Sequence, residues 1–318
     1  MRRLNSDRLR RYVLDRTIGT TYYMGFRTVE KDGLLSDDGK AGAFRCVKTP
    51  RGYWCADPLL FEWDGEIYLF CEMYNKTINR GCIGVAKYNS EKGLFHEILP
   101  IIMEPFHMSF PYIFQYNGDA YMIPETSETS QIRFYKIGNT PYEWHYVGSI
   151  FTEGKCCDSV TIEVDGNLWI ICTEQDSSNP LCNKVIIYTI FEIEDGGRIR
   201  AELIYQSGTF KHNARNGGPV LHIGENHYRV IQRDDEGLYG SGLIFREISV
   251  AHGKYQEKSD WKSIGSNDVK LNVSQFRNEI KGVHTYSRCK NIEVVDFFVY
   301  QMTFKGFIAH IKEVITRR

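Results

Sequence analysis

The sequence predicts an all-β protein, a five-bladed β-propeller with a short basic N-terminal arm. Three observations support this prediction: a hairpin pattern that recurs along the chain, the lack of helical crossover segments between its copies, and an aromatic-rich composition. The 318 residues include 20 tyrosines, 18 phenylalanines and 5 tryptophans, and aromatic side chains favour the pleated surface of a sheet.

The recurring hairpin is recognised by its turn. Four segments align without gaps around a turn residue, and they cover 56–72, 109–125, 157–174 and 216–232. The turn residues are Asp64, Asn117, Asp165 and Gly224. An aromatic residue follows each of them by four positions: Tyr68, Tyr121, Trp169 and Tyr228. Asp-Gly and Asn-Gly between apolar runs are strong hairpin signals, because Asp, Asn and Gly tolerate the positive φ of a type I′ turn.

A third strand-like run follows each hairpin, at 83–88, 132–137, 185–190 and 243–248. A weaker fifth unit runs from 282–300 to a final run at 307–314. Turn residues stand about 50 to 65 residues apart, which is enough for a sheet of three to four strands in each unit. Five such units predict five blades around a central channel. A β-sandwich is the alternative fold, although a sandwich does not require the same register in every unit.

This interpretation divides the chain at residue 40. Residues 1–39 are predicted to form an N-terminal arm and a lead-in strand, and residues 40–318 to form the propeller. Segment 1–16 mixes six arginines with a few apolar residues, so it is either a short helix outside the propeller or a solvated tail.

Charge and composition argue against several classes of protein. Lys plus Arg is 39 and Asp plus Glu is 40, so the formal net charge is −1, whereas a nucleic-acid binder needs a basic surface. No apolar run is long enough for a transmembrane helix, and the basic start lacks the apolar stretch of a signal peptide. We therefore expect a cytoplasmic protein, with the basic arm as the candidate for peripheral membrane contact.

Cysteine usage and motif content agree with this expectation. The nine cysteines are scattered without a C-x-x-C pair, which favours reduced thiols in the core over a disulfide framework. The chain has no P-loop, no G-x-G-x-x-G and no H-E-x-x-H motif, so neither a cofactor nor a metal site is predicted.

Carboxylates recur at positions that a propeller brings to one end of its channel. Seven residues before the turn residue stand Asp57, Phe110, Asp158 and Gly217. Eight or nine residues after it stand Glu72, Glu125, Glu174 and Gln232. Glycoside chemistry uses two carboxyl groups, roughly 5 Å apart for a covalent route or roughly 6.5–9.5 Å apart when water attacks directly. Crowding of like charges also raises one pKa, which keeps a general acid protonated near neutral pH.

Other polar residues stand at the same strand edges. Trp54 lies beside Asp57 and can stack on a sugar face. His107 precedes the second inner strand, Arg215 the fourth and His284 the fifth. Cationic or switchable groups beside acids suit a sugar, a sugar phosphate or a nucleotide sugar. The ordinary alternative is structural: an Asp that caps a turn, a solvated Glu, or an Arg paired with a neighbouring carboxylate.

Several stretches resemble a known family. They are ADPLLFEWDGEIYLFCE at 56–72, EPFHMSFPYIFQYNGDAYMIPET at 104–126, ARNGGPVLHIGENHYRVIQ at 214–232, YGSGLIFREI at 239–248 and KGVHTYS at 281–287. These stretches resemble the N-terminal propeller domain of plant glucosamine inositolphosphorylceramide transferase, which is in turn similar to the five-bladed propellers of family 43 glycoside hydrolases. The resemblance covers roughly residues 40 to 315.

The resemblance implies roles for several acids. Asp57 takes the position of the base in family 43 hydrolases, and Asp158 that of the acid that tunes and orients. Either Glu125 or Glu174 takes the position of the proton donor, and Glu125 is favoured. In the plant protein, transferase chemistry is attributed to a separate C-terminal domain, so the family name does not by itself assign that activity to these residues.

The first function hypothesis is a carbohydrate-active enzyme, which carries out a glycosyl-transfer or glycoside-cleaving step in surface polysaccharide or glycolipid biosynthesis. The alternative is a non-catalytic glycan-binding or scaffold propeller that serves a partner glycosyltransferase. A propeller that only binds proteins would not need acids clustered in one register. Replacing Asp57 by Asn separates the first two hypotheses, since only an enzyme loses turnover.

Overall fold

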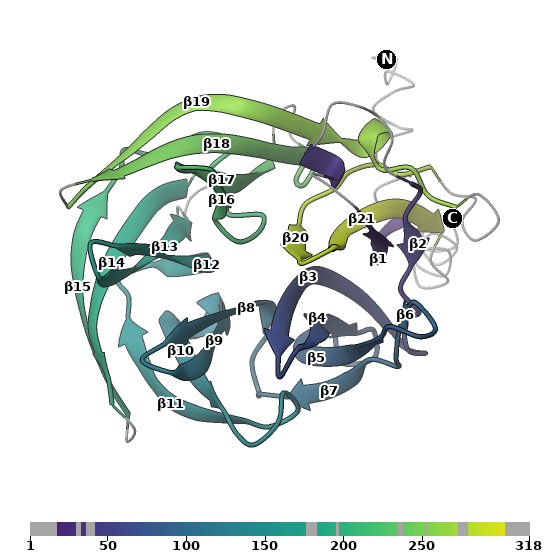
Figure 1. Ribbon diagram of the computed structural model, residues 1–318, viewed down its shortest axis with the longest axis horizontal. Helices are drawn as coiled ribbons and strands as arrows, with labels where there is room; N and C mark the ends of the chain where they lie inside the picture. The colour runs from purple at the N-terminus through teal and green to yellow at the C-terminus, as the bar shows by residue number, and fades with distance from the viewer. Residues whose placement is uncertain are drawn as a thin grey trace, which may run out of the picture.

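The computed structural model describes residues 18–29, 33–35, 42–175, 183–194, 197–234, 238–251, 253–272 and 279–302. Five groups of strands are arranged like blades around a central axis (Figure 1). The prediction of an all-β, five-bladed propeller is therefore confirmed. The predicted arm at 1–16 lies outside the described residues. Among the described residues, no helix is long and apolar enough to cross a membrane.

The first four blades follow one another along the chain. Blade I contains β3 (Tyr53–Trp63), β4 (Glu66–Asn75), β5 (Arg80–Asn89), β6 (Leu94–Phe95) and β7 (Leu99–Ile102). Blade II contains β8 (Ser109–Tyr116), β9 (Asp119–Glu125), β10 (Gln131–Ile137) and β11 (Trp144–Phe151). Blade III contains β12 (Lys155–Val164), β13 (Asn167–Gln175), β14 (Asn183–Ile193) and β15 (Gly197–Gln206). Blade IV contains β16 (Leu221–Ile223), β17 (Asn226–Arg233), β18 (Gly242–Ala251) and β19 (Lys254–Gly265).

Blade V joins the two ends of the described chain. Its strand order is β2-β1-β21-β20, and its members are β20 (Tyr286–Cys289), β21 (Ile292–Met302), β1 (Ile18–Thr28) and β2 (Arg45–Cys46). Strand β1 pairs antiparallel with β21 from end to end. The sequence predicts that the run 307–314 completes the fifth blade, but β1 lies beside β21 in this structure. The run 307–314 itself lies outside the described residues. The buried ion pair between Arg27 and Glu293, 2.5 Å from Nε to Oε1, fastens this closure.

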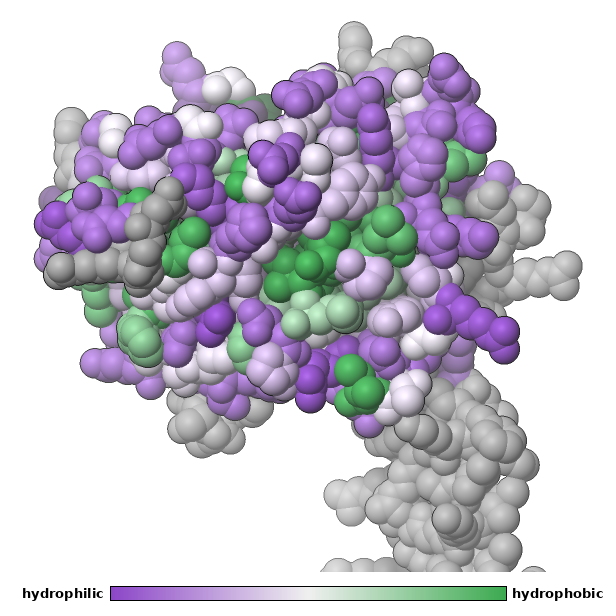
Figure 2. All heavy atoms as spheres, turned by 90° about the horizontal axis from the view of Figure 1, so that it is seen from below, coloured by the Kyte–Doolittle hydropathy of each residue, from purple (hydrophilic) through white to green (hydrophobic). Residues whose placement is uncertain are grey.

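Short 3₁₀ turns complete the described elements: η1 (Gly33–Leu35), η2 (Ser127–Thr129) and η4 (Ser266–Asp268). Blades II and III share one extended sheet, because β11 pairs in parallel with β15 at the rim. Apolar side chains fill the spaces between neighbouring blades, for example Phe110, Phe134 and Ile170 in one cluster. Figure 2 shows the rim from below, largely hydrophilic with one apolar patch in its middle.

The predicted hairpin turns occur where expected. Asp64, Asn117 and Asp165 have φ values of 48°, 50° and 49°, and the glycine after each also has a positive φ, as a type I′ turn requires. In blade IV, Gly224 provides the positive φ. These turns follow the inner strands β3, β8, β12 and β16. The first residues of the inner strands therefore lie at the opposite end of the channel from the turns.

The start of the inner strand is distorted in the same way in three blades. The register shifts between Ala56 and Leu59 in blade I, and equivalent shifts occur in blades II and III. The bulged residues Asp57, Phe110 and Asp158 have φ values of 51°, 44° and 47°. A non-glycine residue in this region carries strain of order 1 kcal/mol, and such strain is concentrated at functional sites. The repeated bulge thus marks the end of the channel where two aspartates stand.

Candidate active site

A cavity of about 240 Å³ lies at this end of the channel. Its lining residues come from all five blades: Tyr22, Trp54, Ala56, Asp57, Glu72, His107, Ser109, Glu125, Asp158, Arg215, Tyr239 and His284. Eight of the ten site residues predicted from the sequence are among them, and Glu174 and Gln232 are the two exceptions. Most of the predicted residues therefore lie together at this end of the channel.

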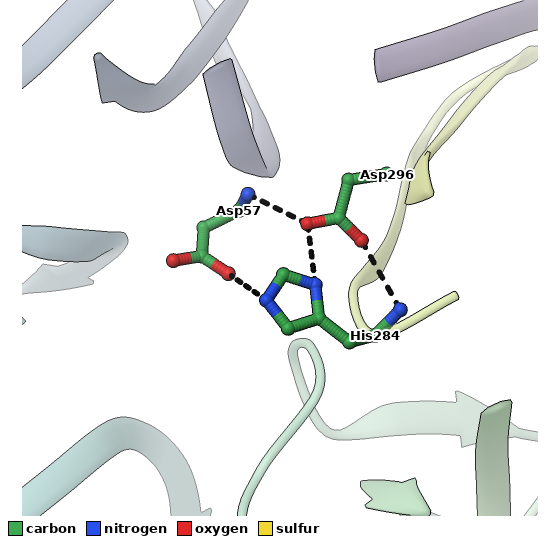
Figure 3. Close-up of side chains that lie close together, drawn as sticks. All are labelled: Asp57, His284 and Asp296. Atoms are coloured by element: carbon green, nitrogen blue, oxygen red, sulfur yellow. Dashed lines mark hydrogen bonds and ion pairs between the residues drawn. The ribbon is translucent and has the colours of Figure 1, made fainter. Parts of the chain in front are cut away.

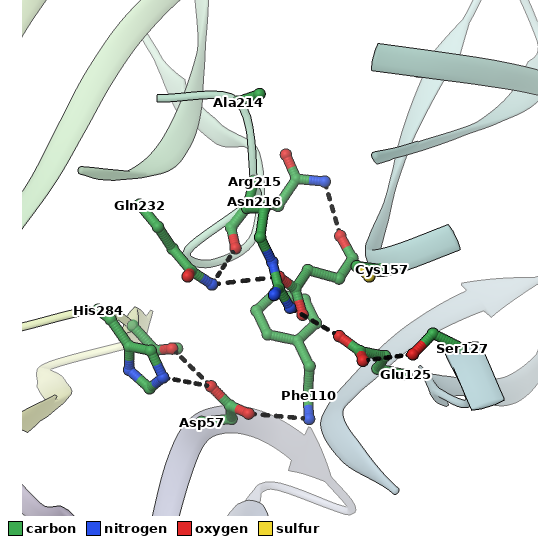
Figure 4. Close-up of polar contacts among 12 residues, drawn as sticks. Asp57, Phe110, Glu125, Ser127, Cys157, Ala214, Arg215, Asn216, Gln232 and His284 are labelled. Atoms are coloured by element: carbon green, nitrogen blue, oxygen red, sulfur yellow. Dashed lines mark hydrogen bonds and ion pairs between the residues drawn. The ribbon is translucent and has the colours of Figure 1, made fainter. Parts of the chain in front are cut away.

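Asp57 is buried and lines the cavity. Its Oδ2 accepts a hydrogen bond from the backbone N–H of Phe110 at 3.1 Å, and its Oδ1 accepts one from the Thr285 hydroxyl at 2.9 Å (Figure 4). Burial raises the pKa of Asp57 to about 6; the charge of His284 opposes this shift, whereas Asp296 adds to it. Asp57 is therefore poised to exchange a proton near neutral pH.

His284 stands between two aspartates (Figure 3). Its Nδ1 lies 2.6 Å from Asp296 Oδ2 and its Nε2 lies 3.6 Å from Asp57 Oδ1. Burial lowers the pKa of His284, but the charge of Asp296, a hydrogen bond to it and the charge of Asp57 outweigh burial and raise the pKa to about 9. His284 is therefore an imidazolium at neutral pH.

Ligand atoms of Asp57, His284 and Asp296 lie within 4.8 Å of one another, so this group could hold a metal ion. Asp296 is nevertheless occupied by protein donors: its oxygens accept backbone N–H groups of Asp57 at 2.9 Å, His284 at 3.2 Å and Thr285 at 2.7 Å. A cationic His284 also repels a metal ion. The arrangement fits an imidazolium that is ion-paired with two carboxylates better than a metal centre.

The charge of His284 predicts a pH-dependent stability. Because its folded-state pKa of about 9 exceeds the usual 6.5, its contribution is complete below pH 6.5 and is lost as the pH rises through 9. The loss is of the order of 2–3 kcal/mol between about pH 6.5 and 10. Urea unfolding of wild type and His284→Gln across this range should show a shallower decline in the variant. Parallel declines in the two proteins would contradict the assignment.

Arg215 bridges two carboxylates on the opposite wall. Its Nε lies 2.7 Å from Asp158 Oδ2 and its Nη2 lies 2.8 Å from Glu125 Oε2 (Figure 4). Ser127 donates a second hydrogen bond to Glu125, at 2.9 Å. Burial raises the pKa of Asp158 to about 7, with Arg215 opposing and Glu125 adding to the shift. Glu125 is thus paired with Arg215 and hydrogen-bonded by Ser127, and its expected role as the proton donor stays a prediction.

Aromatic rings form the remaining wall. Trp54 stacks on Tyr74 with centroids 4.4 Å apart and planes 6° apart. The ring centroid of Tyr22 lies 5.0 Å from that of Trp54 and 4.9 Å from that of His284. The guanidinium of Arg215 lies 5.2 Å from the centre of the Tyr239 ring. Such rings give a sugar both an apolar face and hydroxyl groups for hydrogen bonding.

Gln232 and Glu174 have other places. Gln232 is buried behind the cavity, where its Nε2 donates to Asp158 Oδ2 at 3.2 Å and to the Asn216 carbonyl at 2.7 Å, so it positions Asp158. Glu174 stands nine residues after its turn residue, where the other blades have eight, and that equivalent position is Thr173. Since side chains alternate along a strand, Glu174 lies on the face opposite to that of Thr173, with its Oε1 3.9 Å from Lys184 Nζ.

Several residues of the site were not predicted. They are Tyr22, Ser109, Tyr239 and Asp296. Asp296 had a signal in the sequence, since it is a lone acid in the apolar run 294–299. Tyr22 lies on β1, which reaches the cavity only because blade V closes with the N-terminal strand. Tyr239 lies in a connection between strands, where no repeat position applies.

Solved structures place the fold in a known class, the five-bladed propellers. An exo-β-1,3-galactanase from Clostridium thermocellum is 13% identical with a TM-score of 0.54, over 75% of this chain and 59% of that one. The α-L-arabinofuranosidase PaAbf62A from Podospora anserina is 9% identical with a TM-score of 0.53, over 88% of this chain and 97% of that one. At these identities the likeness shows the fold alone.

The sequence identifies the family. Residues 46–296 match the family described as glucosamine inositolphosphorylceramide transferase 1, N-terminal, and the chain belongs to this family. The transferase of that name from Arabidopsis thaliana is 31% identical over 212 residues, 61% of this chain and 25% of the plant protein. The transferase of the same name from Oryza sativa subsp. indica is 27% identical over 241 residues, which are 74% of this chain and 31% of the rice protein. The chain thus spans between a quarter and a third of these relatives, and the resemblance seen in the sequence is confirmed.

Proposed function

We propose that this protein binds a sugar unit of a glycan or glycoconjugate in the channel-end cavity and acts on its glycosidic bond, by transfer or by cleavage. The observation that carries the proposal is the pair of buried aspartates, Asp57 and Asp158, whose pKa values are raised to about 6 and about 7 in one cavity. Carboxyl groups poised near neutral pH are what glycoside chemistry requires.

The cavity suits a small, hydroxylated ligand. Its volume of about 240 Å³ is below the range of roughly 300–1,000 Å³ for sites that take drug-sized ligands, so it fits a single sugar unit. Asp57 is the base that takes a proton from the attacking hydroxyl group. Asp158, held by Arg215 and Gln232, orients the sugar and stabilises positive charge that develops at its anomeric carbon.

The relatives support a role in glycan synthesis. The plant proteins are named as transferases that act with glucosamine and inositolphosphorylceramide, and the solved neighbours as a galactanase and an arabinofuranosidase. We extend to this chain only the general class, a step in the biosynthesis of a surface polysaccharide or glycolipid. A cytoplasmic location stays a prediction. The eight cysteines in the described part of the chain are free thiols, as this prediction expects.

A non-catalytic glycan-binding module is the second candidate. Two observations favour it: Arg215 already engages two of the four carboxylates, and the chain matches only part of each plant relative. Such a module would hold the glycan for a partner glycosyltransferase. It predicts the same ligand as the enzyme but no turnover.

A ligand screen tests the proposal. Thermal unfolding is measured with simple sugars, sugar phosphates and nucleotide sugars, and every ligand that raises the melting temperature is then assayed for hydrolysis and transfer. Stabilisation by a sugar-containing ligand together with turnover is expected. Stabilisation without turnover would favour the binding module, and a panel without any stabilising ligand would contradict both readings.

A further inference from the structure

Glu72 differs from the other carboxylates of the cavity. Each of the others accepts hydrogen bonds from two donors, and they are Asp57, Asp158 and Glu125. Glu72 is as buried as Asp57, with 5% of each residue exposed, yet within the described part of the chain its buried Oε1 accepts no hydrogen bond. An ionised carboxylate in such a place would lack the donors that compensate for the loss of water, whereas a protonated one would not need them.

The surroundings of Glu72 are closely fitted. A Cβ atom at Gly81 would stand 2.6 Å from Glu72 Oε1 and 2.8 Å from His107 Cε1, so only glycine leaves room for both side chains. The backbone N–H of Gly81 donates to His107 Nδ1 at 3.0 Å. Since Nδ1 is an acceptor, the ring proton of a neutral His107 is on Nε2, which faces Glu72 Oε1 at 3.5 Å.

We propose that Glu72 is the proton donor of the site, a protonated carboxyl group that gives its proton to the oxygen leaving the anomeric carbon. This inference rests on the proposed function. The O–H bond of Glu72 breaks as a new O–H bond forms on the leaving oxygen, and the bond from that oxygen to the anomeric carbon breaks. A water molecule or an acceptor hydroxyl forms the new bond to carbon and passes its proton to Asp57, so charge and atoms balance.

His107 is a positioning residue for this step. Its Nε2 lies 3.5 Å from Glu72 Oε1, and it can form the hydrogen bond that Glu72 lacks at rest once the proton leaves and this oxygen becomes negative. Burial lowers the pKa of His107, against the charges of Glu128 and Asp57, so the imidazole is neutral and does not ionise Glu72 beforehand. Burial also raises the pKa of Glu72 well above its usual range, and the charges of Asp57 and Glu125 raise it further.

The protonation of Glu72 is tested without a substrate. Protein labelled with ¹³C at the glutamate carboxyl groups is titrated by NMR, and the signal missing in Glu72→Gln is assigned to Glu72. It should have the shift of a protonated carboxyl group at about pH 7.5, well above the usual glutamate pKa of about 4.3. The signal of the exposed Glu163, assigned through Glu163→Gln, is the reference with which the Glu72 signal is compared. A carboxylate shift for Glu72 at this pH would overturn the proposal.

The donor role is tested with two leaving groups. Glu72→Gln should lose about 10²–10⁴ in kcat on a glycoside with an alkoxide leaving group, but far less on one with a dinitrophenolate, which leaves without a proton. Glutamine reproduces the shape of the protonated acid, so the melting temperature should be unchanged. Equal activity of variant and wild type on the alkyl glycoside would overturn the inference, whereas a wild type inactive on every glycoside would refute the proposed function instead.

Discussion

Replacing Asp57 by asparagine should reduce turnover by a factor of about 10²–10⁴ while the fold survives. Asparagine has the same shape, and its carbonyl oxygen can still accept the backbone N–H of Phe110. His284 keeps Asp296 as its anionic partner. What the variant lacks is a group that takes a proton from the attacking hydroxyl, so kcat should fall much more than ligand affinity.

A pH profile sharpens this prediction. Asp57 must be ionised to act as a base, and its pKa is about 6, so wild-type kcat/KM should rise as the pH rises through about 6. The residual kcat/KM of Asp57→Asn should not show this rise with pH.

The matched control is Asp64→Asn in the hairpin turn of the same blade. Asparagine tolerates the φ of 48° at this position, which lies at the far end of the strand, so activity and melting temperature should be unchanged. Full turnover by Asp57→Asn would refute the base assignment. Unchanged ligand binding in a protein whose wild type shows no turnover would favour the glycan-binding module.

The fold could be predicted because its signals are local. Asp64-Gly65, Asn117-Gly118 and Asp165-Gly166 fix the hairpins through the backbone conformations that these residues tolerate. Counting from such a turn gives the face of each side chain, and this placed Asp57 and Asp158 together. The count does not cover Glu174, because this residue stands one position beyond Thr173, the equivalent of Glu72 and Glu125, and neighbouring residues of a strand lie on opposite faces.

The rest of the site depends on contacts between distant segments. Closure of blade V by β1 brings Tyr22 next to His284, and no repeat position in the sequence records that pairing. The roles of the acids also depend on their neighbours. Glu125 and Glu72 have equivalent places in the repeat, but Arg215 reaches only Glu125, and this difference separates a paired carboxylate from a protonated acid.

Replacing Arg215 by methionine should lower the free energy of unfolding by about 3–5 kcal/mol at about pH 8, because Asp158 and Glu125 would lose the cation that offsets the cost of their burial. The control is Arg200→Met, which removes an exposed ion pair with Glu192 and should change stability by less than about 1 kcal/mol.

The loss caused by Arg215→Met should depend on pH. In the wild type, Arg215 opposes a pKa of Asp158 that burial has raised to about 7, so without Arg215 this pKa rises further. A folded-state pKa above the unfolded value stabilises the protein at low pH, and this contribution is lost as the pH rises through the folded pKa. The variant should therefore lie closest to wild type near pH 5 and fall away above pH 7, as urea unfolding at several pH values would show. A deficit that stays constant with pH would mean that Arg215 contributes by packing, for instance against Tyr239, rather than by holding two carboxylates ionised.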